Sequence, residues 1–118
     1  EGQIDYKSGV AMAGSLAGSS LGATAVGAAA DILAIGAVRG FYDAGLRVPE
    51  DMSIIGFDDL EISQYLAPGL TTIRQQISLK GQRAVELLLE HIADPSLSKQ
   101  EEILPLKLIE RGSVRKLS

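Results

Sequence analysis

The sequence predicts an α/β fold, built on a mainly parallel sheet with helices on both faces. Three observations lead to this class. Predicted helices and strands alternate along the 118 residues, which is the order that forms a parallel sheet. The strand predicted at 52–57 is apolar at nearly every position, as in strands that are covered on both faces. Right-handed crossovers between such strands place helices on both faces of the sheet.

The first quarter of the chain predicts a strand, a helix and a second strand. We interpret residues 3–6 as a short strand. A helix is expected from Ser8, because apolar residues follow it at helical spacing. Gly and Ser at 18–20 predict its end. Residues 24–28 are short and uncharged, which is typical of a buried strand.

The middle of the chain continues the alternation. Asp31 is expected to be the N-cap of a helix whose apolar residues repeat on one face, and Gly45 is expected to end that helix in a left-handed conformation. The buried strand at 52–57 follows. A short helical piece at 60–66 and a strand at 70–73 complete this part.

The last part predicts one long amphipathic helix and one strand. Apolar residues define one face of the helix at 78–93, and Asp94-Pro95 stops it. Leu104, Leu106 and Leu108 then alternate with polar or proline positions. Pro105 cannot donate to a ladder of hydrogen bonds, so this strand is expected at a sheet edge or to start there.

Composition excludes several classes of function. The formal net charge of −4 and the pI near 4.9 argue against a nucleic-acid surface on this chain. Without cysteine there is no disulfide or thiolate zinc site, and His91 is the only histidine, so we expect no metal and no cofactor. The 23 residues between Lys7 and Asp31 carry no charge but are rich in Gly, Ala, Ser and Thr, so we expect no membrane span.

The candidate chemistry lies where the predicted strands end. Ligands of open parallel sheets bind beyond the carboxyl ends of the strands. Asp58 and Asp59 follow one strand, Arg74 and Gln75 follow the next, and Ala30 and Asp31 follow the strand at 24–28. Carboxylate and amide groups at such an edge suit hydroxyl-rich ligands. Alternatively, the two aspartates cap the next helix. Adjacent carboxylates do not suit acid–base catalysis, and no nucleophile motif occurs, so an enzyme is not expected.

Several strings of the sequence resemble the C-terminal part of the effector-binding domain in lactose/galactose-repressor (LacI/GalR) family transcription regulators. The match covers about residues 24–113, with a weaker one before residue 10. The strings that carry it are Val48-Pro-Glu-Asp51, Gly56-Phe-Asp-Asp59, Leu70-Thr-Thr-Ile-Arg-Gln75 and Leu108-Ile-Glu-Arg-Gly-Ser113.

This resemblance implies a periplasmic-binding-protein-like fold, in which two subdomains close around a small effector such as a sugar or nucleobase. The chain begins without Met, so we expect a fragment or a processed form, comprising most of the C-terminal subdomain. The helix at 77–94 is expected to pack on the missing N-terminal subdomain and to leave an apolar face exposed here. Operator DNA would be bound by a helix-turn-helix head outside this chain, in the cytoplasm.

The resemblance also assigns effector-binding positions. Asp58 stands where the family has an effector-binding aspartate, and Gln75 where a polar residue lines the cleft. Two positions depart from the family pattern. Ile4 stands in place of an aromatic ring that stacks on the effector, and Ala30 in place of Asn or Ser. A ligand with an apolar face, or control by a protein partner, are the alternatives that these departures leave open.

The family forms dimers through its C-terminal subdomains, so the resemblance implies a homodimer. The corresponding surface holds Ile32, Ile35, Gly36 and Leu60. Ile32 can equally belong to the core, and the apolar face of the predicted helix favours the core for Ile35. A fragment of a periplasmic sugar-binding transport protein is the alternative function.

Overall fold

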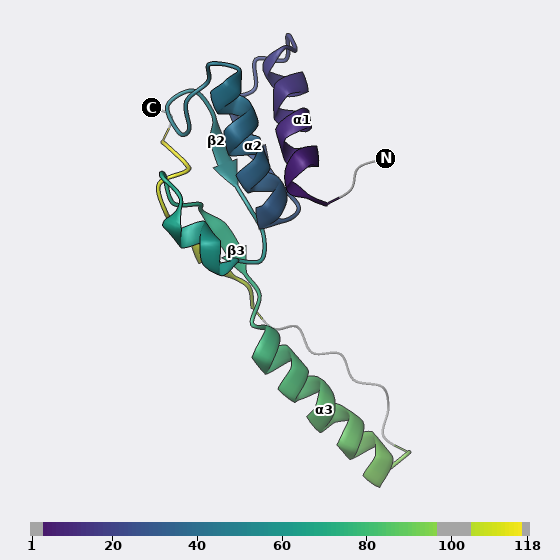
Figure 1. Cartoon of the computed structure of the whole chain (residues 1–118). Coiled ribbons are helices and arrows are strands. Elements are labelled where there is room, and N and C mark those ends of the chain that lie inside the picture. The colour runs from purple at the N-terminus through teal and green to yellow at the C-terminus, as the bar shows by residue number, and fades with distance from the viewer. Residues whose placement is uncertain (1–3, 97–104, 117–118) are drawn as a thin grey trace. The chain divides into compact units, whose positions relative to one another are not determined.

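The computed structural model describes residues 4–96 and 105–116, which form two compact units (Figure 1). Unit 1 runs to Arg74 and resumes at Leu108, and unit 2 runs from Gln75 to Lys107. The elements follow the predicted order. They are α1 (Tyr6–Ala17), β1 (Ala25–Gly27), α2 (Asp31–Asp43), β2 (Ser53–Ile55), the 3-10 helix η1 (Glu61–Tyr65), β3 (Thr72–Arg74), α3 (Ile77–Ala93) and β4 (Lys107–Ile109).

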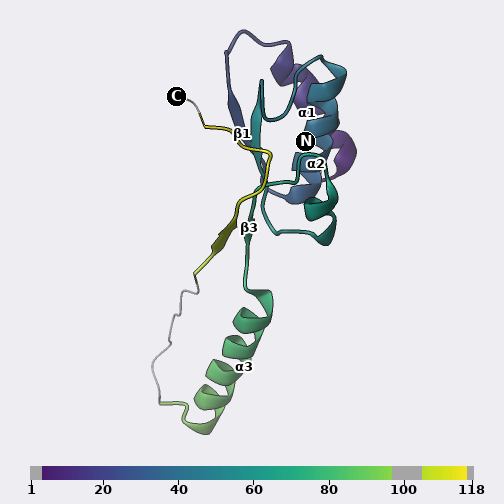
Figure 2. The ribbon, with the colours of Figure 1, turned by 90° about the vertical axis from the view of Figure 1, so that its left-hand side faces the viewer.

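The strands confirm a mainly parallel sheet. β1 and β2 pair in parallel, with Val26 opposite Ile54. On the other side of β2, a parallel bridge joins Ile55 to Thr71, just before β3. β3 in turn pairs with β4. Figure 2 shows α1 and α2 together on one side of β1.

Helices α1 and α2 lie against each other through glycines. A Cβ atom added at Gly40 would lie 2.5 Å from the carbonyl oxygen of Val10 and 2.7 Å from the Cβ of Ala13. Gly9 and Gly36 bring the two backbones equally close. In both views the two helices share one face of β1 and β2 (Figures 1 and 2). The expected covering of both faces by helices is therefore not seen in the described part of the chain.

The core of unit 1 lies between α2, β2 and the segment before β3. Ala34, Phe41, Ile54 and Leu70 are fully buried there. Gly45 has a positive φ of 84° and ends the turn after α2, as predicted. The next amide, that of Leu46, donates to the carbonyl oxygen of Phe41 at 2.8 Å, so the chain turns back onto the core.

The start of the chain differs from the prediction. Residues 4 and 5 form a bend rather than a strand, and residue 3 lies outside the described part. The carboxylate of Asp5 accepts a hydrogen bond from the amide of Ser8 at 2.8 Å, which makes Asp5 the N-cap of α1. Helix α1 therefore begins at Tyr6, two residues before the predicted start, because this cap satisfies an otherwise unpaired amide.

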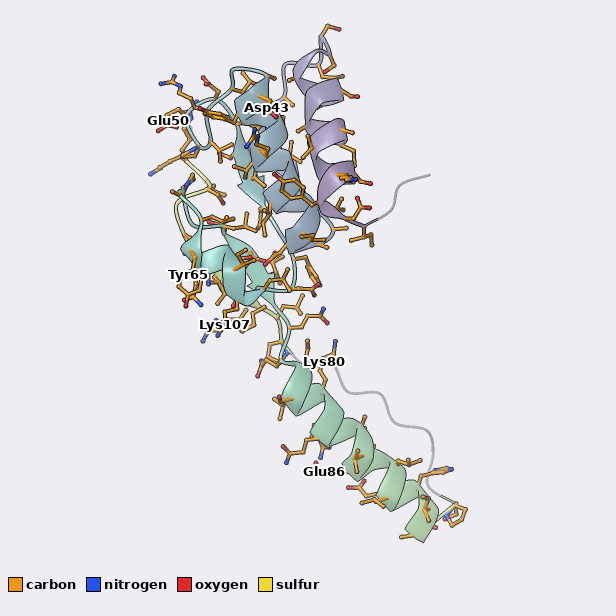
Figure 3. All side chains as sticks on the ribbon, in the orientation of Figure 1. Asp43, Glu50, Tyr65, Lys80, Glu86 and Lys107 are labelled. Atoms are coloured by element: carbon orange, nitrogen blue, oxygen red, sulfur yellow. The ribbon has the colours of Figure 1, made fainter. Side chains whose placement is uncertain are left out.

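Helix α3 confirms the expected exposed apolar face. None of its residues, all of which the structure describes, is buried. Its most exposed large apolar side chains are Ile77, Val85, Leu88, Leu89 and Ile92. Lys80 and Glu86 also project from the helix (Figure 3). That this helix packs on another subdomain stays a prediction.

The last strand and the uncharged segment agree with the sequence in outline. β4 begins two residues after Pro105, and its side chains are mostly exposed. Leu104 lies outside the described residues. The uncharged segment divides into α1, a turn with Gly22 at a positive φ of 67°, and β1. No helix among the described residues is long and apolar enough to cross a membrane.

Candidate functional site

The carboxyl ends of β1, β2 and β3 meet at one edge of the sheet, as predicted. The amide of Asp31, after β1, donates to the carbonyl oxygen of Phe57, after β2, at 2.8 Å. The amide of Asp58 donates to the carbonyl oxygen of Ile73, in β3, at 2.8 Å. These bonds bring the segments that begin at Ala30 and Asp58 side by side.

The backbone that leaves β2 makes an unusual turn at residues 58–60, which we call the Asp58 turn. Asp58 has a φ of 110° and Asp59 a φ of 57°, and both values fall in the region that favours glycine. Such a conformation in residues that carry a Cβ persists only where surrounding contacts hold it. It is often found at binding sites.

Asp31 is completely buried behind this turn. Its Oδ2 atom accepts hydrogen bonds from the amide of Leu60 at 2.8 Å and from the hydroxyl of Ser63 at 2.6 Å. Its Oδ1 atom accepts one from the hydroxyl of Thr72 at 2.6 Å. A single carboxylate thus ties α2 to the Asp58 turn, to η1 and to β3.

The prediction that Asp31 is an N-cap is wrong by one residue. Ala30 occupies the cap position, with extended φ and ψ of −155° and 151°, and Asp31 is the first residue of α2. The three donors around Asp31 explain the difference, because they draw its carboxylate away from the first turn of the helix and into the core.

The carboxylate of Asp59 is held by two arginines. Its side chain is only 8 % exposed and forms ion pairs with Arg74 at 2.7 Å and with Arg111 at 3.0 Å. Burial raises the pKa of Asp59, but hydrogen bonds from Arg74 and Arg111 outweigh it and hold the pKa below its ordinary value. Arg111 also donates to the carbonyl oxygen of Leu70 at 2.8 Å. Asp59 therefore links the turn to β3 through Arg74 and to the segment after β4 through Arg111.

Asp58 and Asp59 are both partly buried as whole residues. Neither aspartate stands at the cap of the following helix, because the N-cap of η1 is Leu60. The interpretation of the pair as helix caps is therefore wrong. Of the two, Asp59 is the one that pairs with Arg74 and Arg111.

The other predicted effector-binding residues are placed as follows. Ala30 follows β1 and is 9 % exposed, beside the end of β2. Ile4 precedes α1 and is 65 % exposed. Gln75 belongs to unit 2, where its side-chain oxygen accepts a hydrogen bond from Lys80 at 3.0 Å. The effector-binding roles of these three residues stay predictions.

The predicted dimer residues lie in different environments. Ile35 packs against the core, and Ile32 is partly buried on α2. Gly36 is buried where α2 meets the backbone of Tyr6. Leu60 is exposed, at the start of η1. Gly36 is therefore used for packing within this chain, and the dimer role of these residues stays a prediction.

Two residues that sequence reasoning did not single out hold the site together. Ser113 is buried and donates through its hydroxyl to the carbonyl oxygen of Ile54 at 2.6 Å, while accepting from the amide of Thr71 at 2.8 Å. Thr72 is buried between Asp31 and the Asp58 turn. Thr72 lies between apolar residues at 70 and 73, a pattern that could have marked it as a buried hydrogen-bonding group, whereas Ser113 lies between Arg111 and Arg115 and carries no such signal.

Beyond this edge, the described residues also form an apolar pocket. A pocket of about 700 Å³ lies between α1, β1 and α2, and Met12, Leu16, Val26 and Phe41 are among the residues that line it. Its lining does not include the Asp58 turn. No group of three or more His, Asp or Glu side chains in the described ranges could hold a metal ion.

Comparison with known proteins gives consistent matches. Residues 4–114 match the model of the periplasmic binding protein-like domain. The ribose operon repressor of Haemophilus influenzae is 38 % identical over 117 residues, which are 99 % of this chain and 35 % of that protein. The ribose operon repressor of Escherichia coli (strain K12) is 40 % identical over 83 residues, 70 % of this chain and 25 % of its own length. The chain thus spans about a quarter to just over a third of the length of these relatives.

Solved structures of LacI family regulators also superpose on this chain. A LacI family transcriptional regulator from Enterococcus faecium with bound ribose superposes with a TM-score of 0.83 and 39 % identity, over 98 % of this chain and 42 % of that one. The lac repressor dimer bound to operator and the anti-inducer ONPF superposes with a TM-score of 0.86 and 35 % identity, over 97 % of this chain and 40 % of that one.

Proposed function

Because the chain belongs to the periplasmic binding protein-like domain family, we propose that it is the effector-sensing and dimer-forming part of a LacI-type transcription repressor. The repressor relatives confirm the resemblance to the lactose/galactose-repressor family. They favour a repressor over a component of sugar transport, because the relatives reported above are transcription regulators.

The Asp58 turn carries the proposal. It lies where the parallel strands end, which is the edge at which open sheets bind ligands. A carboxylate there accepts hydrogen bonds from two hydroxyl groups of one ligand. The family resemblance has an effector-binding aspartate at position 58, and the neighbouring Asp59 pairs with two arginines, so we assign Asp58 to the effector. The matching regulator from Enterococcus faecium has bound ribose, which makes a sugar the effector class to test first.

The proposed mechanism is a shift between two conformations. The effector binds one state of the domain better and so changes the population that a DNA-binding head experiences. The chain itself has a formal charge of −4, so DNA binding is assigned to a separate head. Binding involves no reaction, and the effector is released unchanged. The protein would act in the cytoplasm as a homodimer.

Calorimetric titration with D-ribose tests the proposal. The experiment uses the complete protein that carries these 118 residues, together with its Asp58→Asn and Glu61→Gln variants. Asn tolerates a positive φ and keeps the shape of Asp while it removes the charge. Glu61→Gln removes the same charge three residues away, on the exposed side of η1.

We expect ribose affinity to fall at least about tenfold in Asp58→Asn, since a hydrogen bond to a charged group contributes about 1.5–3 kcal/mol. Glu61→Gln should bind as the wild type does. Equal binding by Asp58→Asn and the wild type would remove the assignment of Asp58.

A further inference from the structure

We propose that Asp31 and Thr72 are positioning residues for the effector, acting through the backbone of the Asp58 turn. Neither residue needs to touch a ligand for this role. The inference rests on the proposed function for the identity of the ligand. The claim that Asp31 and Thr72 hold the Asp58 turn does not rest on it, and the experiment below tests the two claims separately.

Three consecutive amides of the turn are held by three acceptors from outside it. The amide of Asp58 donates to the carbonyl oxygen of Ile73 at 2.8 Å. The next amide, that of Asp59, donates to the hydroxyl oxygen of Thr72 at 3.3 Å. The third, that of Leu60, donates to the carboxylate of Asp31 at 2.8 Å. The second and third acceptors are side chains, so their identity is set by the sequence.

The two side chains act as one unit. Thr72 donates its hydroxyl hydrogen to Oδ1 of Asp31 at 2.6 Å, which leaves its oxygen lone pairs directed to the amide of Asp59. Both residues have no exposed surface, so water does not compete for these bonds. The buried carboxylate therefore orients the hydroxyl, and the hydroxyl orients the turn.

The turn needs this support because of its backbone conformation. Positive φ values at two successive residues with side chains are disfavoured unless neighbouring groups fix them. The backbone dihedrals of the turn set the direction in which the Cα–Cβ bond of Asp58 leaves the chain. Loss of the acceptor at Thr72 frees the amide of Asp59, so the turn, and with it this bond, is held less firmly in one conformation. A carboxylate that is not fixed in advance binds its ligand more weakly.

The chain offers a matched control at Ser63. Its hydroxyl also donates to Asp31, at 2.6 Å, and it is buried like Thr72. It differs from Thr72 in that none of the three amides of the turn donates to it, since their acceptors are Ile73, Thr72 and Asp31. Ser63→Ala therefore removes a buried hydrogen bond to the same carboxylate while it leaves the three acceptors of the turn in place.

The experiment compares Thr72→Val, Thr72→Ser and Ser63→Ala in the complete protein that carries these residues. Valine keeps the shape of threonine without the hydroxyl, and serine keeps the hydroxyl. Two quantities are measured at a temperature where circular dichroism shows every variant to be folded. They are the affinity for D-ribose by calorimetry and the positions of the amide signals of residues 58–60 by nuclear magnetic resonance.

We expect Thr72→Val to bind ribose about tenfold more weakly and to shift the amide signals of residues 58–60. Thr72→Ser should restore both to wild-type values, and Ser63→Ala should change affinity less than about twofold. Wild-type amide signals in Thr72→Val would overturn the inference, and so would equal losses of affinity in Thr72→Val and Ser63→Ala. If the wild type does not bind ribose, the proposed effector class fails, and the amide signals alone decide whether Thr72 holds the turn.

Discussion

Alanine at Gly40 is the sharpest perturbation of the contact between α1 and α2. The new Cβ would lie 2.5 Å from the carbonyl oxygen of Val10 and 2.7 Å from the Cβ of Ala13, whereas ordinary contacts of this kind are 3.4–4 Å. The helices must therefore separate by about 1 Å, and overpacking of this kind costs about 1–3 kcal/mol. Alanine gains about 1 kcal/mol over glycine in a helix. Because backbone is the obstacle, we take the upper end of the cost and expect a net loss of about 2 kcal/mol.

The matched control is Gly14→Ala, in the interior of α1. Nothing lies within 4 Å of the position that its Cβ would occupy, so only the helical preference acts. We expect this variant to gain about 0.5–1 kcal/mol. Urea unfolding of the 118-residue chain, followed by circular dichroism, gives both free energies of unfolding. If both variants gain stability, α1 does not pack on α2 at Gly40 and the close approach of the two helices is refuted.

Three further outcomes follow from the structure. Asp5→Ala removes the cap of α1 and should lower the free energy of unfolding by about 0.5–2 kcal/mol, measured in urea; no loss would mean that the bond to Ser8 is not formed. The pKa of Asp59 is lowered in the folded chain, so its stabilising effect is complete above its ordinary pKa of 3.8 and is lost as the pH falls through the folded value. The difference in the free energy of unfolding between the wild type and Asp59→Asn should therefore be constant from pH 5 to 7, because this window lies above the ordinary carboxyl pKa of about 4. Below pH 3.8 the difference should shrink. A constant difference at all pH values would contradict the two ion pairs. Leu88→Lys, on the exposed face of α3, should change the stability of the 118-residue chain by no more than about 0.5 kcal/mol, and a larger loss would show that this face is covered.

Much of the fold could be predicted from local patterns. The long helix and the apolar run at 52–57 have strong periodicity or composition, and the structure contains both as α3 and β2. The alternation of elements predicts parallel strands, and this in turn places Asp31, Asp58 and Arg74 at one edge. Local propensity and the rules of parallel sheets were sufficient for these features.

The roles of the acidic residues could not be predicted, because they depend on partners distant in sequence. The position of Asp31 before an apolar repeat predicts a helix cap. Its hydrogen-bond partners, however, include Ser63 and Thr72, which are 32 and 41 residues away. Residue type and strand position do not distinguish Asp58 from Asp59, and only the family resemblance gives Asp58 a role. Arg111, 52 residues from Asp59, is what separates them.

The glycines show the same limit. Gly14, Gly18 and Gly22 recur every four residues along the sequence, but an added Cβ at Gly14 or Gly22 would meet open space. The glycines that pack two helices together are Gly36 and Gly40, four residues apart on α2, with Gly9 opposite. Which helix faces which neighbour is a property of the assembled fold, so a spacing alone cannot assign it.

A crystal structure of the complete protein grown with D-ribose would test the central claim most directly. The account predicts ribose at the carboxyl edge of the sheet, with one of its hydroxyl groups donating to the Asp58 carboxylate at hydrogen-bond distance and with the Asp59 carboxylate still bound to Arg74 and Arg111. Ribose bound away from the Asp58 turn, or with Asp58 directed away from it, would contradict the assignment of this edge as the effector site.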